Sequence, residues 1–326
     1  MDRNAVREHT TSVRLAGYAS NPARWRLPAA ELTDAEREEA LRRWPTTRDA
    51  VQALYDGLAD TRLSQEFALI MGLHRECFIM AEALARVIGF RSVYWQARQC
   101  FELGLTAARA EGEKDWEAVI CTRMGVLWAA EGSPDEAAAW YRSAYDLHEA
   151  TRHRLGLASV CECWARAEAE RRDYHRAEEL AWRARDLFEA EGRERGVAIT
   201  DRRLALLSFY LGRVDEALSR YKHLITRFDD LGDEVMAAKV RAEYAQALIA
   251  DRRCETALEQ ITIAGQEFVT CGADRDVIRM DVLRAAAYAK LGDREQAHNL
   301  LLTAYRAYTR TGDQSRANRL AEQLAR

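Results

Sequence analysis

The sequence contains few residues that interrupt helices. Only 4 of its 326 residues are proline, and three of them, Pro22, Pro28 and Pro45, lie before residue 50. Proline is rare inside helices because it lacks a backbone donor and its ring clashes with the preceding turn. Arginine, alanine, glutamate and leucine, which all favour helices, dominate the remainder. The chain beyond its first fifty residues is therefore expected to be helical.

Long apolar runs and a strong excess of one charge are also missing. No uninterrupted apolar stretch reaches the roughly 20 residues of a membrane-spanning helix, and residues 1–15 lack the apolar centre of a signal peptide. The net charge of -4 gives no general reason to expect nucleic-acid or membrane binding. We therefore expect a cytoplasmic protein with no membrane partner, for which nucleic acid is a disfavoured partner and the oligomeric state is open.

The cysteines show no pairing pattern. There are seven, an odd number, and none lies in a CxxC arrangement. Without an export signal, free thiols in a reducing compartment are the expected state. Cys161 and Cys163 are two residues apart on an expected helix and point in different directions, so buried, unreactive thiols are favoured at these positions.

No constellation of catalytic residues is present either. GxSxG, HExxH, GxGxxG and P-loop motifs are all missing. His148 and His153 are off the i, i+4 spacing that places two ligands on one helix face, so solvated turn histidines are favoured over a metal site. The acidic segments 111–117 and 227–234 fall in expected turns, where solvated carboxylates are favoured. We expect no enzyme activity, no metal and no cofactor.

What the sequence does contain is a repeat of forty residues. "YLGRVDEALSRY" at 210–221 resembles "EGSPDEAAAWY" at 131–141 and "KLGDREQAHNLL" at 290–301. An alanine recurs every forty residues, at Ala97, Ala137, Ala177, Ala217, Ala257 and Ala297. Another small residue lies twelve positions before each one, at Ala85, Gly125, Ala165, Ala205, Ala245 and Ala285. Six units in one register indicate a repeat protein.

Each class of repeated position has a structural interpretation. The paired small residues allow two helices to cross closely, and bulky residues four and eleven positions after the alanine share one helix face. Fifteen positions after the alanine, five of the six units have a glycine that would end the second helix in a left-handed turn: Gly112, Gly192, Gly232, Gly272 and Gly312. Each unit is therefore predicted to be an antiparallel helix pair that buries its apolar face by stacking on its neighbours.

This pattern resembles the tetratricopeptide repeat family over roughly residues 75–326. The family often has a third small residue seven positions after the second, and here that position holds Gly104, Ala144, Ala184, Leu224, Ala264 and Ala304. The period exceeds the usual one of the family by about six residues, so longer helices or turns are expected. The resemblance is to the forty-residue variety of bacterial regulators, and it implies an all-α, right-handed α-solenoid.

The repeats do not account for the whole chain. Residues 75–314 are predicted to form six units, and residues 315–326 a C-terminal capping helix with a polar outer face. The register fails at residues 47–74, where a degenerate helical pair broken near Gly57 is expected. Residues 1–46 are predicted to be a partly flexible arm with one short helix, its first thirty residues loosely packed.

In tetratricopeptide repeats the first helices line a concave surface, and the resemblance implies which side chains a ligand would meet. The candidate ligand-binding residues are Arg123, Arg166, Arg202, Arg203, Phe209, Lys239, Glu243, Gln246 and Arg279. The same face carries Arg86, Glu82 and Glu162, so bases exceed acids on it. One interpretation is a basic groove for a ligand. The other is that these arginines pair with acids of neighbouring helices and leave a self-neutralised face.

The resemblance and the basic face together imply a non-catalytic module that binds a protein or peptide as scaffold, adaptor or sensor. Its expected ligand is an acidic segment or a free C-terminal carboxylate, because arginine pairs well with carboxylates. A peptide-sensing regulator that acts through a partner is one alternative. An accessory subunit of a biosynthetic or defence enzyme complex is another.

Overall fold

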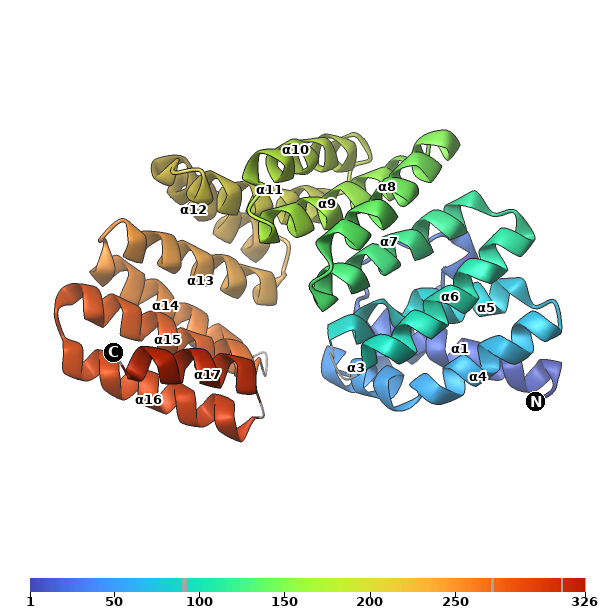
Figure 1. Cartoon of the computed structure of the whole chain (residues 1–326), viewed down its shortest axis with the longest axis horizontal. Helices are drawn as coiled ribbons and strands as arrows, with labels where there is room; N and C mark the ends of the chain where they lie inside the picture. The colour runs from blue at the N-terminus through green and yellow to red at the C-terminus, as the bar shows by residue number, and fades with distance from the viewer. Residues whose placement is uncertain (90–92, 271–272, 312, 326) are drawn as a thin grey trace. The chain divides into compact units, whose positions relative to one another are not determined.

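The computed structural model describes residues 1–89, 93–270, 273–311 and 313–325. Within these residues the chain forms α-helices and two short 3-10 helices, and no β-strand (Figure 1). None of the helices in this part of the chain combines the length and apolar character that a bilayer span needs. The chain divides into two compact units, Met1–Gly192 and Arg193–Arg326.

The first unit begins with four helices that lie outside the repeat register. They are α1 (Arg3–Ser20), α2 (Asp34–Arg43), α3 (Thr47–Asp56) and α4 (Leu58–Ile70), with the short η1 (Pro28–Ala30) after α1. Gly57 separates α3 from α4, at the break expected from the sequence. Helix α1 packs against α2, α3, α4 and α5 and so lies at the centre of this end of the unit.

The first thirty residues are therefore not the loosely packed arm that the sequence suggested. Val6, Val13 and Ala16 on α1 are buried. The five arginines of this stretch all make contacts within the unit: Arg3 with the Met71 carbonyl, Arg7 with Glu76, Arg14 with Glu36, Arg24 with Glu82, and Arg26 with the Gly17 and Asn21 carbonyls. These arginine contacts hold the first thirty residues against the rest of the first unit.

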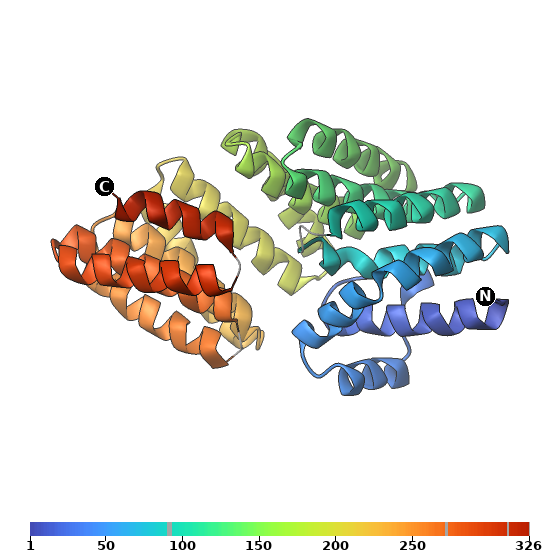
Figure 2. The ribbon, with the colours of Figure 1, turned by 60° about the horizontal axis from the view of Figure 1, so that its bottom comes forward.

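The rest of the first unit consists of three helix pairs. Its helices are α5 (His74–Ala83) continued by η2 (Leu84–Gly89), α6 (Tyr94–Glu111), α7 (Lys114–Glu131), α8 (Pro134–Thr151), α9 (Arg154–Glu170) and α10 (Tyr174–Ala190). Figure 2 shows these helices from a second direction. Ala85, the first small residue of the repeat pattern, lies in η2 and is only half-buried, so the first pair departs from the regular geometry.

The second unit contains three further pairs and a last single helix. The helices are α11 (Glu194–Tyr210), α12 (Val214–Asp230), α13 (Glu234–Ala250), α14 (Cys254–Thr270), α15 (Asp274–Leu291), α16 (Arg294–Arg310) and α17 (Gln314–Leu324). Ala317 and Leu320 of α17 are buried against α16, while Arg319 and Glu322 are exposed. Helix α17 thus covers the apolar face of the last pair with a polar outer surface.

The forty-residue period resides in long helices joined by short turns. From α7 to α17, successive helices begin at residues 114, 134, 154, 174, 194, 214, 234, 254, 274, 294 and 314. The helices from α7 to α16 have 17 or 18 residues each. Because only two or three residues separate consecutive helices in the described stretches, the extra length relative to the usual repeat belongs to the helices.

The turns share a left-handed residue at the same place. Among the described residues, positive φ angles recur every twenty positions at Gly112, Gly132, Arg152, Arg172, Gly192, Gly212, Gly232, Arg252 and Gly292. Glycine adopts this conformation without strain, whereas arginine carries a Cβ that disfavours it. The glycines expected to end two further units, Gly272 and Gly312, lie outside the described residues.

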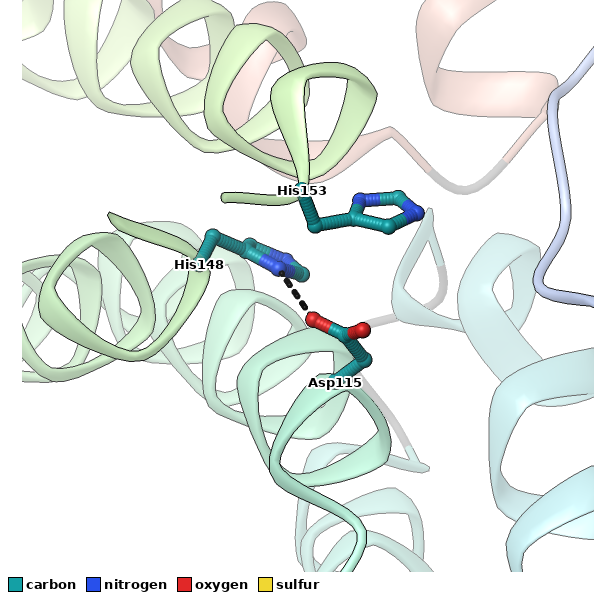
Figure 3. Close-up of side chains that lie close together, drawn as sticks. All are labelled: Asp115, His148 and His153. Carbon is teal, nitrogen blue, oxygen red and sulfur yellow. Dashed lines mark hydrogen bonds and ion pairs between the residues drawn. The ribbon is translucent and has the colours of Figure 1, made fainter. Parts of the chain in front are cut away.

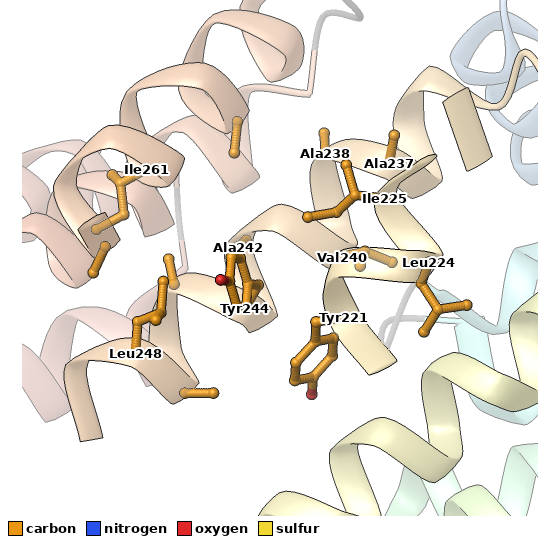
Figure 4. Packing of buried hydrophobic residues seen from close by; sticks show 14 of the residues in the cluster. Tyr221, Leu224, Ile225, Ala237, Ala238, Val240, Ala242, Tyr244, Leu248 and Ile261 are labelled. Atoms are coloured by element: carbon orange, nitrogen blue, oxygen red, sulfur yellow. The ribbon is translucent and has the colours of Figure 1, made fainter. Parts of the chain in front are cut away.

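The core is built from the positions that repeat in the sequence. The alanines that recur every forty residues are all buried. Bulky partners from the second helices fill the space between layers, among them Phe101, Tyr141, Tyr221, Phe228 and Phe268. In the second unit, Tyr221 of α12 lies beside Tyr244 of α13, with ring centroids 6.4 Å apart (Figure 4). In the second unit, one cluster of buried residues spans the helices from α11 to α15, and a smaller cluster joins α16 to α17.

Candidate functional site

In the second unit, Arg202 and Glu243 form a close ion pair. Arg202 of α11 donates from Nε to Oε2 of Glu243 at 2.9 Å and from Nη2 to Oε1 at 2.6 Å. Glu243 lies one helix pair further along, on α13, and its side chain is 9% exposed. At this position the arginine is therefore neutralised by an acid of a neighbouring helix, which is the second of the two interpretations that the sequence allowed.

The other predicted residues of this unit lie around that pair or on neighbouring helices. Burial raises the pKa of Tyr221 well above its ordinary value, Glu243 raises it further, and Arg202 and Arg203 act in the opposite direction. These four side chains are thus close enough to interact electrostatically. Phe209 packs partly buried against the core, 5.6 Å from Tyr210 between ring centroids. The half-buried candidates on α13 and α15 are Lys239, Gln246 and Arg279.

In the first unit, Arg166 is surrounded by acidic groups of its own helix. Burial alone would lower the pKa of Arg166, but Cys163, Glu162 and Glu170 are among the groups that raise it above its ordinary value. Glu162 and Glu170 lie one turn before and one turn after Arg166 on α9, where side chains of opposite charge attract. This arginine is therefore compensated locally as well.

Arg123 has different surroundings, because its charged neighbours include further arginines. Arg24 forms an ion pair with Glu82, and both side chains are largely buried. Positive charge on Arg26, Arg86 and Arg123 acts on the Arg24 guanidinium, and Arg123 also acts on Arg26. We call Arg24, Arg26, Arg86 and Arg123 the arginine cluster. Arg24 and Arg26 lie in the segment before η1, Arg86 lies in η2 and Arg123 lies in α7. Glu82 of α5 is a carboxylate that interacts with Arg24 and Arg26.

Burial and neighbouring positive charges lower the pKa values of two members of the arginine cluster. Burial lowers the pKa of Arg24 to about 9; Glu82 offsets part of this effect, and Arg123, Arg26 and Arg86 add to it. Burial also lowers the pKa of Arg26. With a pKa of about 9, Arg24 remains protonated near neutral pH, where it lies within electrostatic range of the positive charges of Arg26, Arg86 and Arg123 and of the carboxylate of Glu82. Such an arrangement favours an added anion, because like charges brought together in a partly buried site repel.

Two donors of the arginine cluster are buried without a hydrogen-bond partner in the described part of the chain. They are Nε of Arg123 and Nη1 of Arg24. Arg26, by contrast, donates to the carbonyls of Gly17, Asn21 and Arg24 and holds the segment in place. Buried donors are nearly always paired in proteins, so these two guanidinium atoms mark where an acceptor would be stabilised.

The sequence identified Arg123 but not its neighbours from the N-terminal segment. Arg24 and Glu82 are separated by 58 residues, and no periodicity connects residues that lie outside the repeats with residues inside them. The available signal was the apolar stripe of α1, Val6, Val13 and Ala16, which indicates a packed helix. A packed α1 would place Arg24 and Arg26 near the first helix pair of the repeat, but it does not indicate that Arg24 contacts Glu82.

A second group of interest is formed by Asp115, His148 and His153 (Figure 3). The two histidines are not the solvated turn residues expected from the sequence, because His148 is only 1% exposed and His153 is half-buried. Asp115 comes from the acidic segment 111–117, near the start of α7. One atom of each residue that could bind a metal lies within 4.8 Å of the other two.

Hydrogen bonds fix the geometry of this Asp–His–His group. Nδ1 of His148 lies 3.3 Å from Oδ1 of Asp115, and the carboxylate also accepts from Thr151 Oγ1 at 2.6 Å. Nδ1 of His153 accepts from the Gly156 backbone N–H at 2.9 Å and caps α9. Burial and the neighbouring His153 lower the pKa of His148, against the opposing effect of Asp115, to about 4.

The chain matches no protein-family model and no curated protein at the level of sequence. Solved structures share its fold. A Rap protein in complex with Competence and Sporulation Factor aligns over 99% of this chain and 97% of its own, with TM-score 0.61 and 11% identity. Aspartyl phosphate phosphatase F from Bacillus subtilis aligns over 100% of this chain and 94% of its own, with TM-score 0.60 and 12% identity.

A third similar structure is named for the repeat itself. It is a STAND protein with a tetratricopeptide repeat sensor from Pyrococcus horikoshii, which aligns over 85% of this chain and 46% of its own, with TM-score 0.63 and 12% identity. Identities this low demonstrate a shared fold alone. The chain is thus an all-α solenoid of the tetratricopeptide-like class, as its sequence predicted.

Proposed function

We propose that this chain is a non-catalytic module that binds a protein or peptide partner through an acidic segment or a free C-terminal carboxylate. The observation that carries the proposal is the arginine cluster of the first unit, where Arg24, in a largely buried ion pair with Glu82, lies within electrostatic range of Arg26, Arg86 and Arg123. Like charges held close together in a partly buried site are unfavourable in the unliganded chain. An anionic ligand would relieve this repulsion.

Arginine is suited to this ligand because its planar fork can donate two hydrogen bonds to one carboxylate. Nε of Arg123 and Nη1 of Arg24 are buried donors for which the described chain supplies no acceptor. A charge-assisted hydrogen bond contributes roughly 1.5–3 kcal/mol. Two or three such bonds, together with apolar contacts, correspond to about micromolar affinity, near -8 kcal/mol.

A peptide is favoured over other anions by the surface on which the arginine cluster lies. Helices of 17 or 18 residues are about 26 Å long, so a stack of them offers an extended face. The net charge of -4 disfavours nucleic acid, which is attracted by basic surfaces at large. The similar Rap structure was solved in complex with Competence and Sporulation Factor, and this likeness in fold supports a ligand-binding role for the present chain.

The second unit, considered by itself, carries further candidate residues for ligand contact. Arg202 and Glu243 serve as a structural pair, since each satisfies the other. Arg203, Phe209, Lys239, Gln246 and Arg279 remain candidates for ligand contact. Phe209, which is partly exposed, is the apolar member of this set.

The test is a panel of short synthetic peptides titrated against the full chain. The panel contains peptides with several acidic residues and a free C-terminus, copies amidated at the C-terminus, and copies with Asp and Glu replaced by Asn and Gln. Binding of the acidic members is expected to be weakened at least tenfold by Arg123→Gln, the effect of losing about 1.4 kcal/mol. Amide-substituted peptides should bind more weakly than their acidic parents.

Arg142→Gln provides the matched control. Arg142 is exposed on α8, so this variant removes the same charge without touching the arginine cluster. Equal weakening by both variants would indicate a general charge effect. That result, or unchanged affinity in Arg123→Gln, would refute binding at the arginine cluster.

A peptide-sensing regulator is the second candidate. The Rap structure, which aligns over nearly the whole of both chains, was solved in complex with Competence and Sporulation Factor. A sensor must differ in conformation between its free and bound states. Small-angle scattering with and without the tightest acidic peptide separates the two candidates. A change in radius of gyration supports the regulator, and an unchanged radius supports a rigid scaffold.

A further inference from the structure

We infer that Asp115, His148 and His153 bind one divalent transition-metal ion, with Zn²⁺ as the ion that best suits the donors. This inference does not depend on the proposed function. Two imidazoles and one carboxylate are a common donor set for zinc. Hard cations such as Ca²⁺ and Mg²⁺ prefer oxygen ligands throughout, so they fit this group poorly.

The three residues come from consecutive helices and meet at one end of them. Asp115 lies in the first turn of α7, His148 in the last turn of α8, and His153 immediately before α9. Figure 3 shows the three side chains grouped at this junction. A bound ion would therefore link two successive helix pairs of the first unit.

The spacing of the first two ligands already suits a zinc ion. Two atoms bound to one zinc at about 2.0–2.1 Å and the tetrahedral angle are about 3.3 Å apart. Nδ1 of His148 and Oδ1 of Asp115 are 3.3 Å apart. One donor atom of His153 lies within 4.8 Å of a donor atom of each of the other two residues. A movement of about 1.5 Å would bring it to the separation expected for two ligands of one zinc ion.

Neighbouring residues hold the first two ligands in these positions. Thr151 donates to the same Asp115 oxygen at 2.6 Å and orients the carboxylate, as outer groups commonly do around metal ligands. Gly156 leaves room for the His148 ring, because a Cβ at this position would lie 2.4 Å from ring carbon Cε1. The His148 ring consequently has little freedom to turn away.

The proton balance of the site is simple. The Asp115 carboxylate accepts only, so Nδ1 of His148 is the donor of their hydrogen bond. When the ion takes the position between them, the proton of this ring moves to Nε2 and the imidazole remains neutral. No oxidant, reductant or further reactant is needed.

Metal binding by His153 would change the hydrogen bonding at the start of α9. Its Nδ1 accepts the Gly156 N–H and caps α9. Binding of a metal at Nδ1 would replace that bond directly, and binding at Nε2 would require the ring proton to lie on Nδ1. Either mode releases the Gly156 N–H, so metal binding and the N-cap of α9 are mutually exclusive.

The experiment uses the full chain without an affinity tag, because histidine tags bind metals. After removal of metal with a chelator, the chain is titrated with Zn²⁺ by calorimetry and with Co²⁺ by visible absorption. One ion per chain is expected. Hydrogen exchange at the Gly156 amide should accelerate in the metal-bound chain, since its acceptor is lost.

The variants are chosen to keep the local structure while removing ligands. His153→Asn retains a good N-cap residue, and Asp115→Asn retains an amide oxygen that can accept from Thr151. Each should weaken binding by at least tenfold. His175→Asn, at an exposed position on α10, is the matched control and should leave binding unchanged. Failure of the unaltered chain to bind one ion, or binding by His153→Asn or Asp115→Asn as tight as that of the unaltered chain, overturns the inference.

Discussion

Arg202 and Glu243 bind each other through two hydrogen bonds of 2.9 and 2.6 Å that connect α11 with α13. The two residues occupy a face that the sequence assigned to ligand binding, yet each already has its partner. Glu243 is 9% exposed and Arg202 23% exposed. The pair therefore contributes first to the stacking of two helix pairs.

Arg202→Met is expected to destabilise the second unit, because Glu243 would remain buried without a counter-charge. Removal of one partner of a buried pair costs about 3–5 kcal/mol, and the exposure of Arg202 places the effect near 3. Arg202→Met combined with Glu243→Leu should recover most of this loss. Urea unfolding followed by circular dichroism measures both, and wild-type stability in Arg202→Met would contradict the assignment.

The variant Gly125→Ala tests whether helices cross closely at the small positions of the repeat. A Cβ at Gly125 would lie 2.6 Å from Cε1 of Tyr141, which is fully buried. We expect Gly125→Ala to lose about 1–3 kcal/mol despite the better helix propensity of alanine.

Gly265 is the internal control for this prediction. A Cβ there would come no closer than 3.8 Å to Met280, so Gly265→Ala should gain about 0.5–1 kcal/mol from helix propensity alone. Thermal unfolding of the two variants gives the comparison. Shifts of Tm in the same direction would show that the crossing at Gly125 is not tight.

Arg152, Arg172 and Arg252 have left-handed backbones, with φ angles of 57°, 66° and 63°. Each is expected to gain up to about 1 kcal/mol on replacement by glycine, because the Cβ strain disappears. Gly132→Ala is the reverse change at an equivalent turn. Its Cβ would meet nothing within 4 Å, so any loss of stability must come from the backbone. Destabilisation by all three arginine-to-glycine changes would contradict this explanation.

Four cysteines are expected to resist alkylation in the folded chain. Burial raises the pKa of Cys77, Cys100, Cys121 and Cys161 to about 12, so their thiolate populations fall roughly a thousandfold below those of ordinary thiols. Cys163 is half-buried. Treatment with iodoacetamide at about pH 8, followed by peptide mass spectrometry, should label Cys163 before these four.

Denaturing urea provides the control for the thiol experiment, since all four cysteines should then react. Rapid labelling of Cys161 in the native chain would show that α9 is less well packed than described. Cys271 lies outside the described residues and carries no expectation.

The sequence predicted the repeat architecture because the same physical constraint recurs in every unit. Ala137, Ala177 and Ala217 are buried where helices cross, and a pattern present six times can be separated from chance. The turns also repeat, because each needs a residue with a left-handed backbone at the same place. Gly132 and Gly212, which lie between the two helices of a pair, also have positive φ, although the sequence argument considered only the glycines that follow the second helix.

The N-terminal packing and most of the candidate sites could not be predicted in this way. Arg24 meets Glu82 through a contact that occurs once, so no periodicity reveals it. His148 and His153 were judged by their spacing on a single helix, but they lie on either side of a turn and converge with Asp115 from α7. Contacts between elements depend on tertiary geometry, which spacing along one helix does not encode.

The arginine cluster of the first unit is the central claim, and a crystal structure of the chain with the tightest acidic peptide tests it most directly. The claim predicts a peptide carboxylate within hydrogen-bonding distance of the Arg123 guanidinium. A peptide bound on α8 and α10, or one whose carboxylates contact neither Arg24, Arg86 nor Arg123, would contradict it.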